Sequence, residues 1–183
     1  MDESNKDLLR KAIKNQKKAF ARKALDEWSD ALWEKFEDSP LFRQASTVLL
    51  YHSLPDEVDT HKIIAEWSKQ KDIILPVVVG SELELRRYTG LEHLRVGSYQ
   101  IEEPDGCAIE REDIIDLALI PGVSFDFRGN RLGRGKGFYD KLLKRIAAPK
   151  VGICFHFQLR ENLPVDSLDV PMDQVWSERG RIF

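Results

Sequence analysis

The sequence of 183 residues has little cysteine and lacks the residue spacings of a zinc site. Cys107 and Cys154 form no CxxC pair, which argues against a disulfide scaffold or a zinc ribbon and indicates two reduced thiols. The four histidines show no HExxH or other ligand spacing, so we do not expect a structural transition metal.

Long hydrophobic runs are also absent. No apolar run approaches the roughly 18 residues of a membrane span, and the opening MDESNKDLLRK lacks the basic and then apolar layout of a secretory signal. Composition is not extreme either, with 42% hydrophobic and 32% charged residues, which fits neither disorder nor collagen. We expect a cytoplasmic protein without a membrane partner. Because no repeat or linker divides the chain, residues 1–183 should form a single domain.

A large excess of one charge is missing, but the charge is unevenly spread. The formal net charge is −3. Residues 1–23 nevertheless hold eight Lys and Arg against three acids, and residues 128–145 hold seven against the single Asp140. Two local basic segments on an acidic protein indicate a small polyanion rather than a nucleic-acid duplex.

Hydrophobic periodicity predicts strands that alternate with amphipathic helices. Helices are expected over residues 5–25, from Asp26 as N-cap through Phe36 and ended by Pro40, from Asp59 or Thr60 to about Lys71, and over Gly137–Ala147. Buried strands are expected over 46–52, 72–79, 116–121 and 150–157, with a strand exposed on one face over 82–88. Apolar strands between helices indicate a sheet covered on both faces. The expected fold is a single three-layer α/β/α domain with a mostly parallel central sheet.

Ligands of open α/β sheets bind beyond the carboxyl ends of the strands, which draws attention to the loops after 46–52 and 116–121. The second loop contains RLGRGKGFYD, with Gly133, Gly135 and Gly137 between the basic residues Arg131, Arg134 and Lys136. Glycines let the backbone approach a phosphate, and the cations add charge-assisted bonds. The segment has neither P-loop nor dinucleotide-fingerprint spacing. It predicts a phosphate-binding loop, with an ordinary structural turn as the alternative.

Two further features of the sequence are relevant to nucleotide binding. Asp140 is placed to hold a Mg²⁺ that bridges phosphate oxygens, or simply to complement the charge of a helix start. Basic residues recur every four positions in the first helix, at Lys6, Arg10, Lys14, Lys18 and Arg22. This stripe is a solvated face, or its first two members close over phosphates.

Together these segments resemble the 5-formyltetrahydrofolate cyclo-ligase family, also called methenyltetrahydrofolate synthetases. The resemblance rests on Lys6-x-x-x-Arg10, SLPDEVDT with Glu57, EEP at 102–104, GNRLGRGKGFYD and LDVPMDQV. It implies ATP- and Mg²⁺-dependent cyclisation of 5-formyltetrahydrofolate to 5,10-methenyltetrahydrofolate, with release of ADP and phosphate, by a monomer. Residues 91–104 match only loosely, and no folate contact is assigned there.

The resemblance also implies roles for individual residues. The ATP positions map onto Lys6, Arg10, Arg131, Gly133, Arg134, Gly135, Lys136, Gly137, Phe138 and Tyr139. Arg134 and Lys136 would be catalytic, neutralising the transferred phosphoryl group. The metal aspartates map onto Asp140 and Asp169, with Asp173 as a competing ligand. Folate positions map onto His52, Glu57 and Tyr139. His52 is equally suited to ordinary packing, and the alternative for Glu57 is a solvated loop acid.

The chemistry explains why such a site is expected to bind ATP. A formamide is a poor electrophile, so we expect its oxygen to attack the γ-phosphate, after which N10 adds to the activated carbon and phosphate departs. This needs positioning and charge neutralisation rather than a protein nucleophile. Alternatives are a sugar-phosphate isomerase or acyl-CoA transferase, which would not need ATP, and an RNA-binding module, which would bind without turnover.

Overall fold

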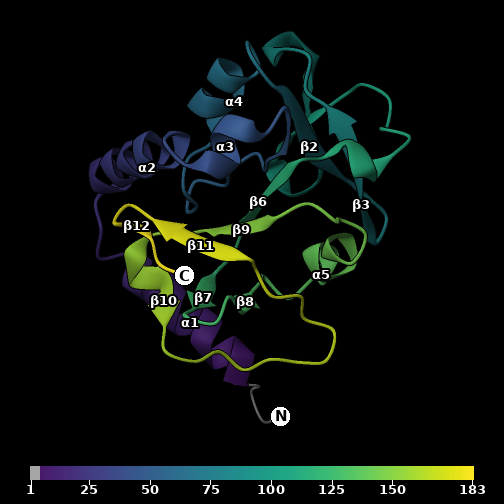
Figure 1. Cartoon of the computed structure of the whole chain (residues 1–183). Coiled ribbons are helices and arrows are strands. Elements are labelled where there is room, and N and C mark those ends of the chain that lie inside the picture. Colours follow the sequence, from purple (N-terminus) through teal and green to yellow (C-terminus); the bar gives the residue numbers. More distant parts are fainter. Residues whose placement is uncertain (1–4) are drawn as a thin grey trace.

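The computed structural model describes residues 5–183, and its centre is a seven-stranded sheet in the order β12-β11-β9-β6-β1-β2-β3 (Figure 1). The inner strands run parallel: β1 (Thr47–Leu49), β2 (Asp72–Val79), β6 (Leu117–Pro121), β9 (Lys150–Ile153) and β11 (Gln174–Ser177). Antiparallel strands lie at both edges, β3 (Glu82–Arg87) beside β2 and β12 (Gly180–Arg181) beside β11. Every residue of β1 and β6 is buried, as expected for strands covered on both faces. The expected mostly parallel sheet is confirmed.

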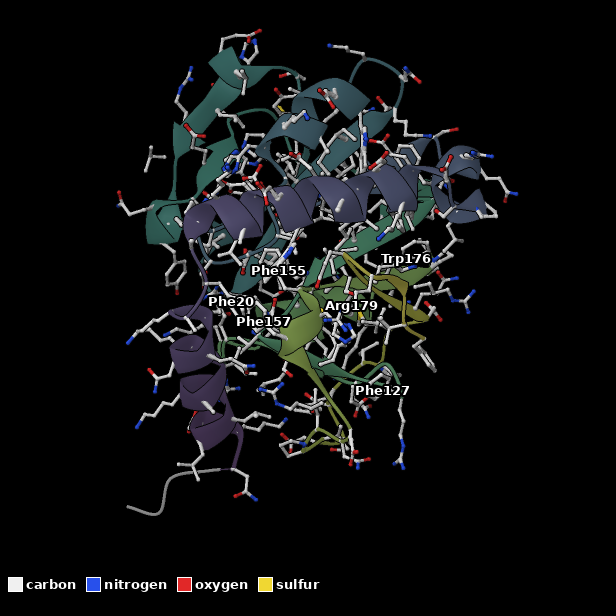
Figure 2. All side chains as sticks on the ribbon, turned by 90° about the vertical axis from the view of Figure 1, so that its left-hand side faces the viewer. Phe20, Phe127, Phe155, Phe157, Trp176 and Arg179 are labelled. Atoms are coloured by element: carbon white, nitrogen blue, oxygen red, sulfur yellow. The ribbon has the colours of Figure 1, made fainter. Side chains whose placement is uncertain are left out.

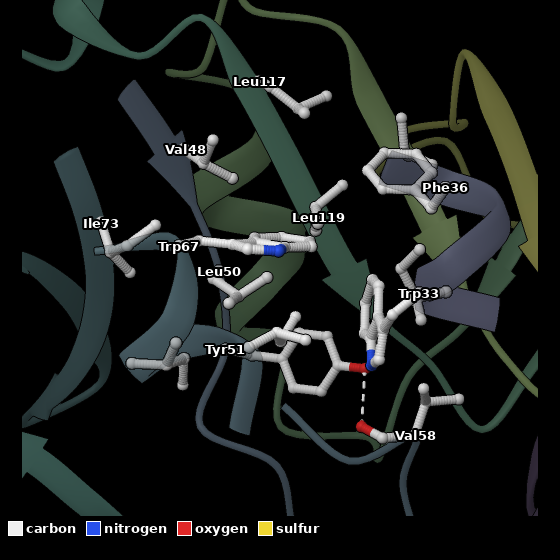
Figure 3. Packing of buried hydrophobic residues seen from close by; sticks show 14 of the residues in the cluster. Trp33, Phe36, Val48, Leu50, Tyr51, Val58, Trp67, Ile73, Leu117 and Leu119 are labelled. Atoms are coloured by element: carbon white, nitrogen blue, oxygen red, sulfur yellow. Dashed lines mark hydrogen bonds between the residues drawn. The ribbon is translucent and has the colours of Figure 1, made fainter. Parts of the chain in front are cut away.

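Three helices cover one face of the sheet: α2 (Arg22–Glu37), α3 (Pro40–Gln44) and α4 (His61–Trp67) (Figure 1). Their apolar side chains meet those of the inner strands in one large cluster (Figure 3). The rings of Trp33 and Trp67 pack edge to face at 5.5 Å. The hydroxyl of Tyr51, two residues after β1, donates to the Val58 carbonyl at 3.1 Å (Figure 3). This last bond ties the loop after β1 to the core.

The opposite face is covered by one helix and a small second sheet. Helix α5 (Phe138–Leu143) contributes Leu142 and Leu143 to a second apolar cluster. The second sheet has the order β10-β7-β8, from β7 (Ser124–Asp126), β8 (Arg131–Leu132) and β10 (Leu159–Arg160). The Phe125 ring of β7 lies so close to β9 that a Cβ on Gly152 would be 2.4 Å from it. The third layer is therefore part helix and part sheet.

Helix α1 (Asn5–Lys17) lies apart from the other helices, beside the small sheet (Figure 1). The prediction of one helix over residues 5–25 is wrong, because there is a break in the helix after Lys17. Phe20 turns inward at the break and its ring packs 4.7 Å from that of Phe157, next to Phe155 (Figure 2). Helix α2 then begins at Arg22, so Asp26 is no N-cap and pairs instead with Arg22 at 2.7 Å.

Pro40 begins a helix rather than only ending one. Ser39 caps α3 by accepting from the Phe42 N–H at 3.2 Å, and proline suits the first turn because its fixed φ is helical and it has no N–H to satisfy. Helices α4 and α5 are shorter than expected. After α4, Lys71 binds the Phe42 and Ala45 carbonyls and so turns the chain toward β2.

The predicted strand over 150–157 ends at Ile153. The Gln158 side chain accepts from the Phe155 N–H at 2.9 Å and donates to the carbonyls of Gly122 and Val123, which curls the chain into a 3₁₀ turn, η4 (His156–Gln158). Strands β11 and β12 were not expected from the sequence.

The remaining elements lie in the stretch between β3 and β6. They are the paired strands β4 (Leu94–Val96) and β5 (Glu102–Pro104) and the 3₁₀ turns η1 (Leu91–His93), η2 (Ser98–Gln100) and η3 (Glu112–Ile114). Within residues 5–183, no helix has the length and apolar character needed to cross a bilayer.

Candidate functional site

The two loops singled out in the sequence meet in the structure. The 53–60 loop follows β1, and the glycine loop (residues 131–137) follows β7 and leads into α5. Arg134 joins them: its Nη2 lies 2.6 Å from Oδ1 of Asp56 and 2.9 Å from Oε1 of Glu57. The other carboxylate oxygen of Glu57 accepts from the Leu54 N–H at 3.0 Å. Glu57 is therefore fixed in its own loop and paired with the glycine loop.

Helix α1 contacts the glycine loop from a second side. The Arg10 Nε donates to the Gly133 carbonyl at 2.8 Å. A Cβ placed on Gly135, whose φ is +90°, would lie 3.3 Å from the Arg10 guanidinium carbon, so both the backbone angle and the close approach favour glycine there. The opening helix and the glycine loop are therefore in contact, and their binding of one nucleotide stays a prediction.

The inward face of α1 differs from the predicted stripe of every fourth residue. Lys6, Arg10 and Lys17 are partly buried and flank the fully buried Ile13, whereas Lys14 and Lys18 are exposed. Positions 6, 10, 13 and 17 follow helical periodicity, with spacings of three and four residues. The stripe is therefore solvated at Lys14 and Lys18, and its first two members face the site.

Lys6 pairs with two carboxylates of the segment before β11. Its Nζ lies 2.6 Å from Asp166 and 2.8 Å from Asp169. Burial opposes ionisation of Asp169, but hydrogen bonds from Lys6 and from the Asp166 N–H, with the charges of Lys6 and Arg131, bring its pKa below the usual value. Asp169 is therefore an anion at neutral pH and stands near Arg131.

Arg131 is the most buried cation of the site, with 5% of its side chain exposed. Its Nη2 lies 2.5 Å from Oδ1 of Asp140, and the guanidinium lies over the Tyr139 ring at 5.4 Å. Its Nε is buried and has no hydrogen-bond partner among the described residues. A buried donor of this kind calls for an acceptor from outside the chain, and an anionic oxygen would supply one.

The rest of the glycine loop is open. Lys136 is exposed, and the part of the chain that the structure describes gives it no hydrogen bond or ion pair. Gly137 has φ +71° and precedes α5, where Phe138 and Tyr139 are half-buried. Burial raises the pKa of the Tyr139 phenol well above its usual value, so this hydroxyl stays protonated and can donate a hydrogen bond.

Asp140 pairs with Arg131, and the charge of Arg131 also acts on Asp169, whereas Asp173 does not join them. Asp173 accepts from the Lys150 N–H at 2.7 Å, at the start of β9 and so at the amino end of the sheet. Within residues 5–183 there is no group of three His, Cys, Asp or Glu that would enclose a metal. The two aspartates suit Mg²⁺ all the same, because that ion commonly takes one or two carboxylates together with water and phosphate oxygens.

The predicted strand over 46–52 ends at Leu49, so His52 lies three residues after β1, next to the 53–60 loop, and is buried. Its ring is 4.2 Å from that of His61, and its Nε2 is 3.5 Å from a carboxylate oxygen of Glu102. Burial and the neighbouring His61 lower the pKa of His52 to about 4, although Asp59 opposes this. His52 is therefore neutral at pH 7 and packs against His61.

Several residues near the site were missed in the sequence. Lys17 and Asp56 are charged partners from α1 and the 53–60 loop, and Asp166 is a second partner of Lys6. Tyr99, at φ +60° in η2, places its exposed ring 6.3 Å from Phe138. A signal for Lys17 was present, since it lies seven residues after Arg10 and thus on the same helix face. Nothing local indicated Tyr99.

Comparisons with known proteins agree on one family. A sequence model described as the 5-formyltetrahydrofolate cyclo-ligase family matches residues 2–178. A solved structure of Aquifex aeolicus 5,10-methenyltetrahydrofolate synthetase is 35% identical, with a TM-score of 0.89 over 97% of this chain and 92% of that one. The 5-formyltetrahydrofolate cyclo-ligase of Haemophilus influenzae is 32% identical over 71% of this chain and 74% of that protein. The mouse protein of the same name is 29% identical over 93% and 92%.

Proposed function

The chain belongs to the 5-formyltetrahydrofolate cyclo-ligase family, and from this premise we propose that it uses ATP and Mg²⁺ for the reaction. As a member of the family it is a ligase that converts 5-formyltetrahydrofolate to 5,10-methenyltetrahydrofolate. The proposal adds that the nucleotide is cleaved to ADP and phosphate at the site formed by α1 and the glycine loop.

The proposed reaction has two steps. The formyl oxygen attacks the γ-phosphorus of ATP, the bond from that phosphorus to the bridging oxygen breaks, and ADP leaves. N10 then forms a bond to the formyl carbon, the carbon–oxygen bond breaks with its electrons going to the departing phosphate, and N10 loses its proton. The oxygen that could not leave as hydroxide thus leaves in inorganic phosphate.

One observation carries the proposal: Arg10 of α1 binds the backbone of the glycine loop at Gly133, so two basic segments distant in the sequence lie against each other. Lys6 and Arg10 supply charge from the helix, and Arg131, Arg134 and Lys136 supply it from the loop. Charge-assisted bonds from such groups neutralise phosphate oxygens. Arg134 and Lys136 are the proposed catalytic cations, because Lys136 has no partner among the described residues and Arg134 is partly exposed.

Asp140 and Asp169 are the proposed ligands of Mg²⁺. When bound, the ion neutralises phosphate charge and orients the nucleotide. Before the ion binds, each carboxylate is compensated by a cation of the site, Asp140 by Arg131 and Asp169 by Lys6.

The folate is proposed to bind at the 53–60 loop. Glu57 can accept from the paired N–H groups of a pterin, the neutral His52 lies at the base of this loop, and the protonated Tyr139 can donate. We also propose that the protein acts in the cytoplasm as a monomer, with no nucleic-acid or membrane partner.

The direct test is incubation with 5-formyltetrahydrofolate, ATP and Mg²⁺, following the methenyl absorbance and ADP together. We expect both products in equal amounts, and neither when either substrate is omitted. Ring closure without ATP would contradict the nucleotide role, and ADP formation without folate would contradict the coupled mechanism.

A further inference from the structure

Four charged side chains interlock where α1, the 53–60 loop and the glycine loop meet. Asp56 lies between two cations: Lys17 contacts both its backbone carbonyl and its carboxylate, the latter at 3.3 Å, and Arg134 lies 2.6 Å from the other carboxylate oxygen. Arg134 continues to Glu57 at 2.9 Å. Two acids and two cations thus balance within one cluster, which we call the Asp56 cluster (Lys17, Asp56, Glu57, Arg134).

Lys17 is the cation of this cluster that is least open to solvent. Its side chain is 10% exposed, whereas that of Arg134 is 44% exposed. Burial lowers the pKa of the Lys17 ammonium, with a smaller contribution from Arg134, against the opposing effects of Asp56 and Glu57. Outside the cluster, Arg22 is a further cation beside the loop, and it binds the Pro55 carbonyl at 2.7 Å rather than either carboxylate.

The bonds seen in this cluster conflict with the bonds that the reaction needs. Both carboxylate oxygens of Glu57 are in use, one with Arg134 and one with the Leu54 N–H. If Glu57 is to accept from a pterin and Arg134 is to neutralise a phosphoryl group, Arg134 has to leave the two acids. Asp56 would then be half-buried beside a site filled with phosphate, and an uncompensated carboxylate there is costly.

We propose that Lys17 is a positioning residue, which keeps Asp56 neutralised and the 53–60 loop in place while Arg134 moves from the two acids to the phosphoryl group. This inference rests on the proposed function, since it needs both a folate at Glu57 and a phosphate near Arg134. Lys17 is not proposed to contact the formyl oxygen or the γ-phosphorus. It acts through Asp56: because its charge still neutralises Asp56, Arg134 can leave the two acids for the phosphoryl group.

The consequence is a specific pattern of kinetic effects. In Lys17→Met the stem is kept and the charge is lost, so Asp56 retains Arg134. We expect kcat to fall by about tenfold and the KM for folate to rise, because Arg134 also stays on Glu57. Lys17→Arg should keep activity within about threefold of the unaltered protein, because the charge remains. Lys18→Met is the matched control, since Lys18, the residue directly after α1, is exposed and its ammonium bonds only to Asn15 among the described residues.

The decisive experiment compares Asp56→Asn with the double variant that also carries Lys17→Met. If Lys17 acts through Asp56, Lys17→Met in an Asp56→Asn background should change kcat by less than about twofold, the two effects being strongly non-additive. This comparison is available even if Lys17→Met alone does not fold. A tenfold fall in that background would mean that Lys17 only braces α1 and would overturn the proposal.

The remaining outcomes separate this inference from the proposed function. If the unaltered protein forms neither the methenyl product nor ADP, the proposed function fails and the inference fails with it. If the unaltered protein turns over normally and Lys17→Met does too, the inference alone is wrong. Loss of activity in Lys18→Met equal to that in Lys17→Met would also contradict it, since a general loss of helix charge would then explain both.

Discussion

The face of the sheet covered by α2, α3 and α4 is held by aromatic and aliphatic packing, whereas the site around α1 is held by ion pairs. Phe36 is fully buried, with the Trp176 ring at 5.1 Å. At the site, Lys6, Arg131 and Arg134 are each paired with carboxylates instead. The packed aromatic and aliphatic side chains cannot exchange their contacts for contacts with water or a charged ligand. Ion pairs can exchange with a charged ligand, so the difference separates the part of the molecule that specifies the fold from the part that can rearrange during a reaction.

The largest effect is expected from truncating a side chain of the packed face, which should lower stability and leave catalysis intact. We expect Phe36→Ala to lower the free energy of unfolding by about 3 to 5 kcal/mol, since it empties a fully buried site. Urea unfolding followed by circular dichroism measures this. The kcat of the folded fraction should stay within about twofold of the unaltered protein; a large loss of kcat with normal stability would mean that this face takes part in catalysis.

The site should respond in the opposite way. We expect Lys136→Ala to lower kcat by about 100-fold, the scale seen when one charge-stabilising group is removed, while the urea midpoint stays unchanged because Lys136 is exposed and unpaired among the described residues. Steady-state kinetics with ATP and 5-formyltetrahydrofolate provides the measurement. Lys144→Ala, an exposed lysine beyond α5, is the control, and an equal loss there would remove Lys136 from the site.

His52, which packs against His61 at the start of α4, tests the comparison through the pH dependence of stability. Its folded pKa of about 4 lies below its ordinary value of 6.5, so the unfolded chain binds more protons between these values and stability falls as the pH drops below about 6.5. From pH 7 to pH 5 the loss from this group is about 2 kcal/mol. Urea unfolding at both pH values should show a smaller loss for His52→Gln. An equal loss in both proteins would mean that His52 is not the group responsible.

The smallest expected effect concerns the backbone of the glycine loop. Gly135→Ala adds a methyl group at φ +90° beside the Arg10 guanidinium, whereas Gly137→Ala adds one at φ +71° with nothing within 4 Å. Each should lose about 1 kcal/mol of stability through backbone strain. Only Gly135→Ala should also raise the KM for ATP, because Arg10 has to shift. Equal KM values in the two variants would argue against a tight fit between α1 and the loop.

The sequence predicted the fold well where hydrophobic runs are continuous. The strands β1, β2, β6 and β9 begin close to their expected positions, because such runs suit only a covered sheet. It failed where a distant partner decides the local structure. The break after Lys17 exists because Phe20 packs on Phe157, and β9 ends early because Gln158 bonds across to the β7 segment. Neither partner is visible from local periodicity.

The same limit applies to the site. Basic residues among glycines pointed to the loop, and Arg10 was found because it belongs to a charged stripe. Lys17 was missed although it shares the face of Arg10, because only the structure shows Asp56 opposite it, 39 residues away in the sequence. The roles assigned to His52, Glu57, Asp140 and Asp169 remain predictions, now with defined neighbours.

The most direct test of the central claim is a crystal structure with Mg²⁺ and a non-hydrolysable ATP analogue. The account predicts that the triphosphate lies between α1 and the glycine loop, with its oxygens within hydrogen-bond distance of Lys6, Arg10 or Arg131. A triphosphate bound elsewhere, for example in the cavity lined by Ala65, Ser68 and residues 88–92, would contradict it.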